Sequence, residues 1–311
     1  MMAEVISNSG KRYLNKSTIV RFIIEPTVRL VLGTSSRLWP EATAFGAEWL
    51  FRTPPRRRPW REEDAWMEDV EFYDVPCGAH RLHVWARGAG PAVLLVHGWG
   101  GRGSQLGALI GPLVEQGYRV VGFDAPGHGQ SSGRQSSLVE MAQAIDELAR
   151  QVGGLHGLVA HSAGAAATTL ALHQAGLPVD RLVYLAPGVS PEDFVDYFTS
   201  RLGLTSGIGD RIQERLERRF DIDFADLNSL TVAPKMRIPL CVLHDPADRE
   251  TAFTASQALV NHWPGASLVE LTGVGHFRIL RAPQTLAAVQ AFFGSPEAAR
   301  QQRIPARIGA A

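Results

Sequence analysis

A serine and a histidine in this sequence each follow an apolar, strand-like run, the serine among small residues and the histidine directly after a glycine. Ser162 lies within Ala-His-Ser-Ala-Gly at residues 160–164, and His276 follows Gly275. A serine hydroxyl becomes a nucleophile at neutral pH when a base accepts its proton, and that base needs an acid that fixes its tautomer. We therefore predict that Ser162 is a catalytic nucleophile and that His276 is its general base. The small neighbours of Ser162 are typical of a strained turn between a strand and a closely packed helix.

The acid of such a triad is expected in a loop after a strand, between the serine and the histidine in chain order. The segment His-Asp-Pro-Ala-Asp-Arg-Glu at residues 244–250 offers two carboxylates, Asp245 and Asp248. We predict that Asp248 is the acid, and that Asp245 caps the turn or orients the loop. The reverse assignment of the two carboxylates is the alternative.

Acyl transfer also requires main-chain N–H groups that stabilise the oxyanion of the intermediate. The third strand-like run ends in His-Gly-Trp-Gly-Gly at residues 97–101. We predict that the backbone N–H groups of Trp99 and of Ala163, the residue after the nucleophile, form this oxyanion hole. The alternative for residues 97–101 is an ordinary glycine-rich turn.

Eight short apolar or β-branched runs follow one another from about residue 70, separated by segments of helical character. The last six are too continuously apolar for strands with one face in water, which indicates a mostly parallel sheet covered on both sides. The predicted fold class is α/β, an eight-stranded mostly parallel sheet with helices on both faces. Sites in such folds lie at the carboxyl ends of the strands, where Ser162, Asp248 and His276 are all expected.

About fifty residues separate the sixth run from the seventh, and their helical patterning predicts a small helical cap at about residues 187–237. Phe194, Tyr197 and Phe198 recur at helical spacing in it, and we predict that they line the substrate pocket. The alternative is that this segment only packs on the body of the domain. The predicted division of the chain is a helical leader, a catalytic domain that contains the cap, and a flexible tail, at residues 1–60, 61–295 and 296–311.

The leader has more apolar surface than one packing partner usually covers. A helix over residues 17–32 places Arg21, Glu25 and Arg29 on one narrow charged stripe, with a kink expected at Pro26. The apolar remainder is expected to be buried against the body of the protein, a partner copy in a homodimer, or the surface of a membrane. The charges and the proline that interrupt this stretch make it neither a signal peptide nor a membrane span.

Five motifs occur here in the order in which α/β-hydrolases carry them, so the chain resembles a serine hydrolase, esterase-like, of the α/β-hydrolase fold superfamily. The motifs are HGWGG, FDAPGHGQSSG, AHSAG, HDPADRE and GVGH, at residues 97–101, 123–133, 160–164, 244–250 and 273–276. The resemblance covers about residues 70–295. Ala160 departs from the commonest pattern, which has glycine there. Because the superfamily includes esterases, lipases, thioesterases, carbon-carbon hydrolases and peptidases, the resemblance implies the fold and leaves the substrate open.

We predict a serine hydrolase that cleaves a small-molecule carboxylic ester through an acyl-enzyme. Thioester cleavage is the nearest alternative, and carbon-carbon or amide cleavage is more distant. A serine at the turn, in place of an aspartate, excludes dehalogenase and epoxide hydrolase chemistry. A binding module with a silent site is the alternative from a different class of proteins.

No metal and no cofactor are expected. Four histidines follow strand-like runs, at positions 97, 161, 244 and 276, but the first three are assigned to turns at strand ends. There is no His-Glu-x-x-His pair for zinc and no glycine loop that cradles phosphates. Asp124 and His128 are expected to form a structural turn, and His161 is expected to pack behind the nucleophile.

The composition argues against a nucleic-acid partner, because the 311 residues carry 31 basic and 31 acidic side chains and phosphate binding needs a basic surplus. Cys77 and Cys241 are predicted to be free thiols, since Cys241 lies in an apolar run. Two free thiols favour a reducing compartment, so the predicted location is cytoplasmic.

Overall fold

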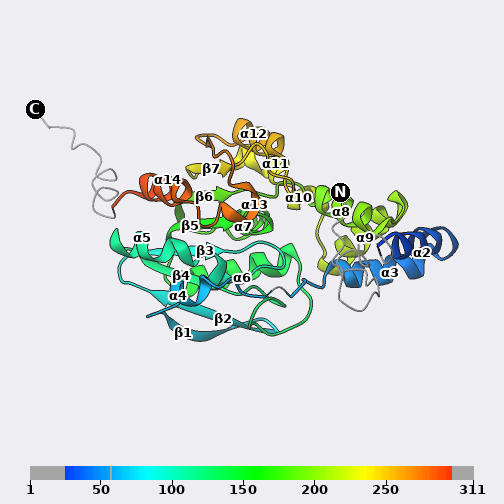
Figure 1. Cartoon of the computed structure of the whole chain (residues 1–311), viewed down its shortest axis with the longest axis horizontal. Coiled ribbons are helices and arrows are strands. Elements are labelled where there is room, and N and C mark those ends of the chain that lie inside the picture. Colours follow the sequence, from blue (N-terminus) through cyan, green and yellow to red (C-terminus); the bar gives the residue numbers. More distant parts are fainter. Residues whose placement is uncertain (1–24, 57, 296–311) are drawn as a thin grey trace, which may run out of the picture. The chain divides into compact units, whose positions relative to one another are not determined.

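The computed structural model describes residues 25–56 and 58–295. Within this part, the chain forms two compact units (Figure 1). The helical unit consists of residues 25–51 together with Phe194–Arg219, and the sheet unit consists of Arg52–Asp193 together with residues 220–295. The leader and part of the insertion therefore belong to one unit, although about 140 residues separate them in the sequence.

An eight-stranded sheet forms the centre of the sheet unit. Its strands are β1 (Glu71–Cys77), β2 (His80–Arg87), β3 (Ala92–Val96), β4 (Arg119–Phe123), β5 (Leu155–His161), β6 (Val179–Leu185), β7 (Leu240–His244) and β8 (Ser267–Glu270). Their order across the sheet is β1-β2-β4-β3-β5-β6-β7-β8. Strand β2 runs antiparallel to β1 and β4, and the other neighbouring pairs are parallel. The predicted fold class is confirmed.

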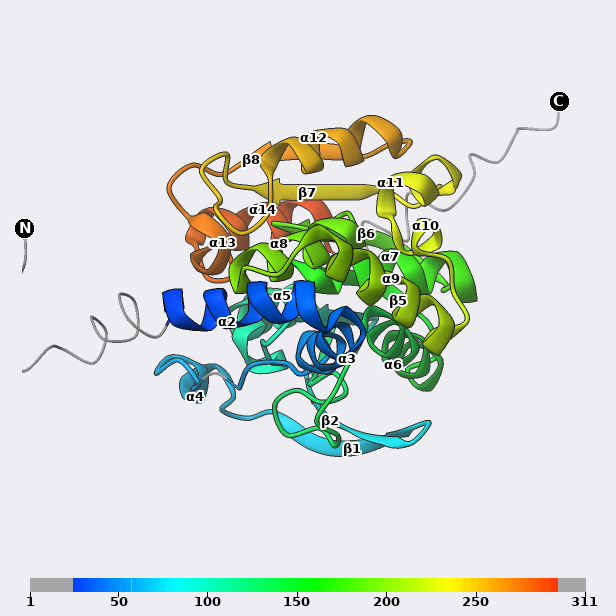
Figure 2. The ribbon, with the colours of Figure 1, turned by 90° about the vertical axis from the view of Figure 1, so that its right-hand side faces the viewer.

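From β3 onward, helices separate these strands along the chain (Figure 2). The sheet unit contains the α-helices α5 (Ile110–Glu115), α6 (Leu138–Gln151), α7 (Ala163–Ala175), α12 (Phe253–His262) and α14 (Pro283–Phe293). It also contains the one-turn α-helices α4 (Glu63–Trp66), α10 (Phe224–Leu227), α11 (Ser229–Val232) and α13 (Gly275–Arg278), and the 3₁₀ helices η2 (Gly103–Leu109) and η3 (Ala233–Lys235).

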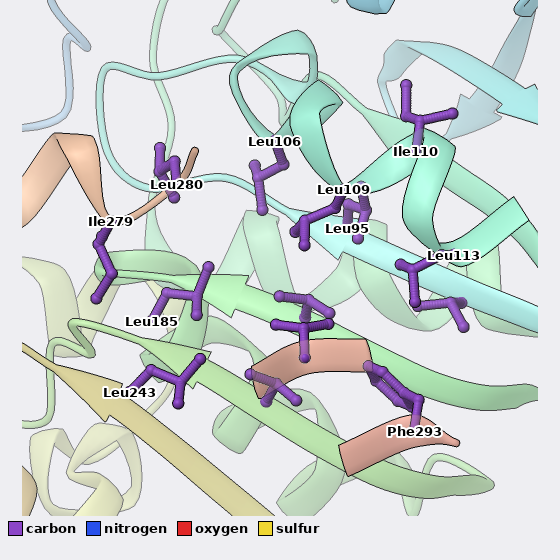
Figure 3. Packing of buried hydrophobic residues seen from close by; sticks show 14 of the residues in the cluster. Leu95, Leu106, Leu109, Ile110, Leu113, Leu185, Leu243, Ile279, Leu280 and Phe293 are labelled. Carbon is purple, nitrogen blue, oxygen red and sulfur yellow. The ribbon is translucent and has the colours of Figure 1, made fainter. Parts of the chain in front are cut away.

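The two faces of the sheet bury different sets of side chains. Alternate residues of β3, β5, β6 and β7 form one core with η2, α5 and α14, and Figure 3 shows Leu95, Leu185 and Leu243 within it. On the opposite face, Tyr184 of β6 hydrogen-bonds with Thr169 of α7 at 3.0 Å. Burial on both faces explains why these strands are continuously apolar in the sequence, and it holds their carboxyl ends in register.

The helical unit contains α2 (Glu25–Leu38), α3 (Pro40–Phe51) and most of α8 (Pro191–Leu202) and α9 (Ser206–Phe220). Helix α2 continues beyond residue 32, where the sequence analysis ended it. The hydroxyls of Thr34 and Ser36 donate to the carbonyl groups of Leu30 and Leu32 one turn earlier, so these polar residues are accommodated within the helix. The part of the predicted helix before residue 25 lies outside the described residues, and the kink expected at Pro26 stays a prediction.

A buried carboxylate joins the leader to the insertion inside the helical unit. Glu48 of α3 accepts hydrogen bonds from the Nε atoms of Arg215 and Arg219 of α9 at 2.7 and 2.8 Å. Burial raises the pKa of Glu48, but the two guanidinium groups outweigh it and hold this pKa below its ordinary value. This ion pair network explains why residues distant in sequence form one unit.

Large apolar side chains of α2, of α3 and of the residue between them are exposed, among them Leu30, Trp39, Phe45 and Trp49. What buries them, whether the body of the protein, a partner copy or a membrane surface, stays a prediction. Over the described residues, no helix combines the length and the apolar character needed to cross a membrane.

Candidate active site

Ser162 occupies a strained turn between β5 and α7. Its backbone has φ +53° and ψ −125°, a conformation that residues with a Cβ rarely adopt. Three hydrogen bonds hold it: the Ser162 N–H donates to Leu185 at 3.1 Å, and its carbonyl accepts from Ala165 at 2.9 Å and from Gly188 at 3.0 Å. The turn places the serine at the N-terminus of α7, where the helix dipole favours negative charge.

The small residues around this turn are explained by close backbone approaches. A Cβ at Gly98 would lie 2.9 Å from the Cβ of Ser162, and a Cβ at Gly164 would lie 2.5 Å from the carbonyl oxygen of His97. Neither position accepts a larger residue without a shift of the main chain. Ala160, where the commonest pattern has glycine, is fully buried in β5, so a single methyl group is accommodated there.

His276 lies in the one-turn helix α13 and faces a carboxylate. Its Nδ1 donates to Oδ2 of Asp248 at 2.8 Å. Asp245 has a different role, because its Oδ2 accepts from the N–H of Gly275 at 2.6 Å and its Oδ1 accepts from the N–H of Ala247 at 2.9 Å. Asp245 thus holds the loop that carries the histidine, while Asp248 contacts the imidazole itself.

Asp248 is held as a carboxylate by its neighbours. Burial raises its pKa, but hydrogen bonds from His244, from His276 and from the N–H of Glu250 hold this pKa far below the usual range. A carboxylate with such partners stays ionised at neutral pH. It is therefore able to orient the His276 ring with Nε2 free to accept a proton, and to stabilise the imidazolium that results.

His161 links the serine turn to the histidine loop. Its Nε2 donates to the carbonyl oxygen of His276 at 2.9 Å, and the two rings lie 4.7 Å apart between centroids. Burial, together with the nearby His276, lowers the pKa of His161 well below its ordinary value. A neutral imidazole that bonds to backbone is a structural element, as expected, and it brings the residue before Ser162 next to His276.

The loop after β3 is built as a tight turn. The N–H of Gly101 donates to the carbonyl of Gly98 at 3.0 Å, and Nδ1 of His97 donates to the same carbonyl at 2.7 Å. Burial lowers the pKa of His97 to about 4, so the ring is neutral and its Nε2 accepts from the N–H of Ala125 at 2.9 Å. Ala163, as the first residue of α7, has an N–H without an acceptor inside the helix.

Asp124 and His128 hold the neighbouring loop together. Asp124 accepts from the N–H groups of Gly103 and Gln130 at 2.8 and 2.7 Å, and Nδ1 of His128 donates to the carbonyl of Pro126 at 2.9 Å. Burial lowers the pKa of His128 to about 3, which keeps it neutral. Asp124 thus bonds to backbone groups of η2 and of its own loop, and His128 bonds through Nδ1 to the backbone of its own loop, in agreement with a structural turn. Among the described residues, Nε2 of His128 is buried without a hydrogen-bond partner. In the described part of the chain, no group of three or more His, Cys, Asp or Glu side chains has the arrangement of a metal site.

The residues predicted to line the pocket lie on α8, in the helical unit. There Phe198 packs edge-on against Phe51, with ring centroids 5.2 Å apart, and Tyr197 is about half exposed. Their contribution to a substrate pocket stays a prediction.

The sequence analysis missed His244 and Thr251. It assigned His244 to a strand-end turn, whereas Nε2 of His244 lies 3.2 Å from Oδ2 of Asp248. The hydroxyl of Thr251 lies 3.3 Å from the same oxygen. The sequence indicates their role only weakly, because all it shows is a polar residue four positions before Asp248 and another three positions after it.

Comparison with known proteins agrees with this architecture. A family model described as serine aminopeptidase, S33, matches residues 89–222. A serine hydrolase-like protein of Danio rerio is 31% identical over 165 residues, which is 49% of each chain. A pyrethroid hydrolase of Sphingobium wenxiniae is 34% identical over 111 residues, 33% of this chain and 40% of the relative. The chain thus matches half or less of the length of these relatives.

Among solved structures, an esterase from Exiguobacterium antarcticum shares the fold. Its TM-score is 0.58 at 19% identity, and the match covers 72% of this chain and all of the esterase chain. At that level of identity the likeness concerns the fold. The family model contains the serine turn but ends before Asp248 and His276.

Proposed function

Because the chain has the α/β-hydrolase fold and a serine aminopeptidase family model matches residues 89–222, we propose that it is a serine hydrolase that cleaves carboxylic esters through an acyl-enzyme. One observation carries the proposal. The strained Ser162 lies at a helix N-terminus, and the side chain of its neighbour His161 bonds to the backbone of His276. His276 in turn bonds to the buried carboxylate of Asp248. A serine hydrolase needs this combination, whereas a binding module has no use for the strain at Ser162.

The mechanism follows from the proposed roles. His276 accepts the proton of the Ser162 hydroxyl while the oxygen attacks the ester carbonyl, and it then donates the proton to the departing alcohol. Asp248 stabilises the imidazolium during both transfers. Water, activated by the same histidine, hydrolyses the acyl-enzyme and regenerates the serine.

The main-chain N–H groups of Trp99 and Ala163 are proposed to stabilise the oxyanion. Ala163 supports this role, since it begins α7 directly after the nucleophile. The turn after β3 supports the role of Trp99, because Gly98, the residue before it, lies against Ser162. Loss of one such donor typically costs about 3 kcal/mol of transition-state stabilisation.

The relatives favour ester substrates over amides, since one of them is named for the hydrolysis of pyrethroids. The family model is described as an aminopeptidase, but it matches the part of the chain without the proposed acid and base. Thioesters remain the nearest alternative, because the same triad attacks both kinds of carbonyl.

A substrate panel tests the proposal. Matched oxygen esters, thioesters and aminoacyl anilides are assayed with the wild-type protein, with Ser162→Ala, and with Ser267→Ala as a control at an exposed serine of β8. We expect ester hydrolysis that Ser162→Ala abolishes and Ser267→Ala retains. Preference for the thioester would move the assignment to a thioesterase, and ester hydrolysis that survives in Ser162→Ala would refute the mechanism.

We further propose that Phe194, Tyr197 and Phe198 contact the acyl chain. Tyr197→Ala is the sharper test, because Tyr197 is about half exposed, whereas Phe198 also packs on Phe51. We expect Tyr197→Ala to change the preferred chain length in a series of esters while the melting temperature stays nearly constant. An unchanged preference would favour the alternative that α8 has only a packing role.

A further inference from the structure

The carboxylate of Asp248 has two imidazole partners on a single oxygen. Oδ2 accepts from Nδ1 of His276 at 2.8 Å, and it also lies 3.2 Å from Nε2 of His244. His276 belongs to α13, whereas His244 is the last residue of β7 and is fully buried. The proposed mechanism uses the first histidine and leaves the second unexplained.

The two partners of His244 indicate which of its nitrogens carries the proton. Nδ1 of His244 lies 2.7 Å from Oγ of Ser256, a fully buried residue in the first turn of α12. The carboxylate has no proton to give at neutral pH, so Nε2 must be the donor toward Asp248. Nδ1 then accepts the Ser256 hydroxyl proton, and the chain Ser256–His244–Asp248 has a single direction of donation.

The other groups around the carboxylate are uncharged donors. The hydroxyl of Thr251 lies 3.3 Å from Oδ2, and the N–H groups of Glu250 and Thr251 donate to Oδ1 at 2.7 and 3.3 Å. His276 itself packs against the neutral ring of His161, with ring centroids 4.7 Å apart. His244 is therefore the one imidazole besides His276 that bonds to this carboxylate among the described residues.

We propose that His244 is a positioning residue, which holds the Asp248 carboxylate against His276 by donating from Nε2, and that Ser256 supports this tautomer by donating its hydroxyl proton to Nδ1. The inference rests on the proposed serine hydrolase mechanism. His244 touches no substrate in it and acts through Asp248. His244 contacts the acid from β7, and Ser256 contacts His244 from α12. The rigid sheet and a covering helix, and not the loop alone, therefore define where the carboxylate lies.

Loss of this donor has two consequences of different kind. The carboxylate becomes less well oriented, which lowers turnover. It also becomes more basic, because one hydrogen bond to its charged form is gone, and it then holds the His276 imidazolium more strongly. The second consequence raises the pH at which the acidic limb of kcat/KM appears, whereas a loss of folded protein lowers activity equally at every pH.

The test compares His244→Leu, which removes the donor, with His244→Gln, whose amide nitrogen approximates the position of Nε2. Ser256→Ala and the double variant Ser256→Ala/His244→Leu complete the set, and His262→Leu is the control at an exposed histidine of α12. Active enzyme is counted with a fluorophosphonate, and kcat/KM is measured from pH 5 to 9 on the best ester.

We expect His244→Leu to lower kcat/KM about 10- to 100-fold, as outer partners of a functional group typically do, and to move the acidic limb upward by about half a pH unit. His244→Gln is expected to recover most of the wild-type kcat/KM and most of the wild-type position of the acidic limb. His262→Leu is expected to match the wild type in both. Ser256→Ala is expected to show a smaller effect of the same sign that vanishes in the His244→Leu background.

Two results would overturn the inference while leaving the proposed function intact. One is an active, Ser162-dependent enzyme in which His244→Leu has wild-type kcat/KM and an unmoved acidic limb. The other is an equal loss in His244→Gln and His244→Leu with no movement of the limb. If His244→Leu does not fold, His244→Gln and Ser256→Ala decide, since an unmoved limb in Ser256→Ala contradicts the tautomer assignment. A wild-type protein without Ser162-dependent hydrolysis would overturn both proposals.

Discussion

Replacing Asp248 by asparagine is expected to lower kcat about ten-thousand-fold, whereas the same change at Asp245 is expected to act mainly on stability. The two residues lie three positions apart in one loop, and each has a depressed pKa. They differ in what they contact. Asp248 bonds to the imidazole of His276, and Asp245 bonds to the N–H of Gly275.

The size of the first effect follows from the donors around Asp248. An asparagine with its oxygen at the Oδ2 position puts its NH₂ group against the N–H groups of Glu250 and Thr251. With the amide reversed, the NH₂ group faces the N–H groups of both histidines. Either orientation sets donor against donor and removes the charge that stabilises the imidazolium. A loss of about ten-thousand-fold, or about 5.4 kcal/mol, is the effect of this change in a serine protease triad.

Asp245→Asn creates a donor conflict at the backbone of the same loop, without contact to the imidazole. The expected cost is about 1–3 kcal/mol of unfolding free energy, the penalty for one unsatisfied buried group. The assay measures kcat on an activated ester per fluorophosphonate-reactive site, together with the melting temperature of each variant. If Asp245→Asn lost more turnover than Asp248→Asn, the acid would be Asp245 and the assignment would be wrong.

Three further results are expected. Gly98→Ala should lower kcat about 100-fold, because the new Cβ would lie 2.9 Å from that of Ser162 and displace the nucleophile; wild-type kcat in a folded variant would contradict the packing argument. Glu48→Gln should cost about 2 kcal/mol of stability in the helical unit, because two arginines of α9 lose their carboxylate; hydrogen exchange should rise there, and unchanged protection of α3 and α9 would refute it. The unfolding free energy should fall as the pH drops below about 4. The folded-state pKa values of Asp245 and Asp248 lie below the unfolded value of about 3.9, so the stabilisation by these carboxylates is lost when they are protonated. An equally steep fall in Asp245→Asn would show that Asp245 does not contribute to this pH dependence.

The sheet was predictable because burial on both faces of β3 to β7 leaves continuous apolar runs, which polar loops separate. The turn at Ser162 was predictable for a similar reason, since close backbone approaches at Gly98 and Gly164 restrict the local sequence to small residues. Chain order indicated where the acid and the base should lie. Chain order did not separate Asp245 from Asp248, because both lie in the loop after β7 and differ in what their side chains contact.

Contacts between distant segments were not predictable. His244 ends an apolar strand, and nothing in its neighbourhood shows that Ser256, twelve residues later, returns to face it. The pairing of Glu48 with Arg215 likewise joins segments that share no pattern. The extent of α2 was missed because Thr34 and Ser36 resemble a helix end in sequence, although their hydroxyls bond within the helix.

Site-specific labelling by a fluorophosphonate tests the central claim most directly. The reagent phosphonylates a serine oxygen when that oxygen has been activated as a nucleophile. The folded protein, the heat-denatured protein, Ser162→Ala and Ser267→Ala are treated alike, and the modified peptide is identified by mass spectrometry. We predict stoichiometric labelling at Ser162 in the folded wild type and in Ser267→Ala, with none in Ser162→Ala or after denaturation. A folded wild-type protein that remains unlabelled, or is labelled at another serine, would contradict the assignment of Ser162 as the nucleophile.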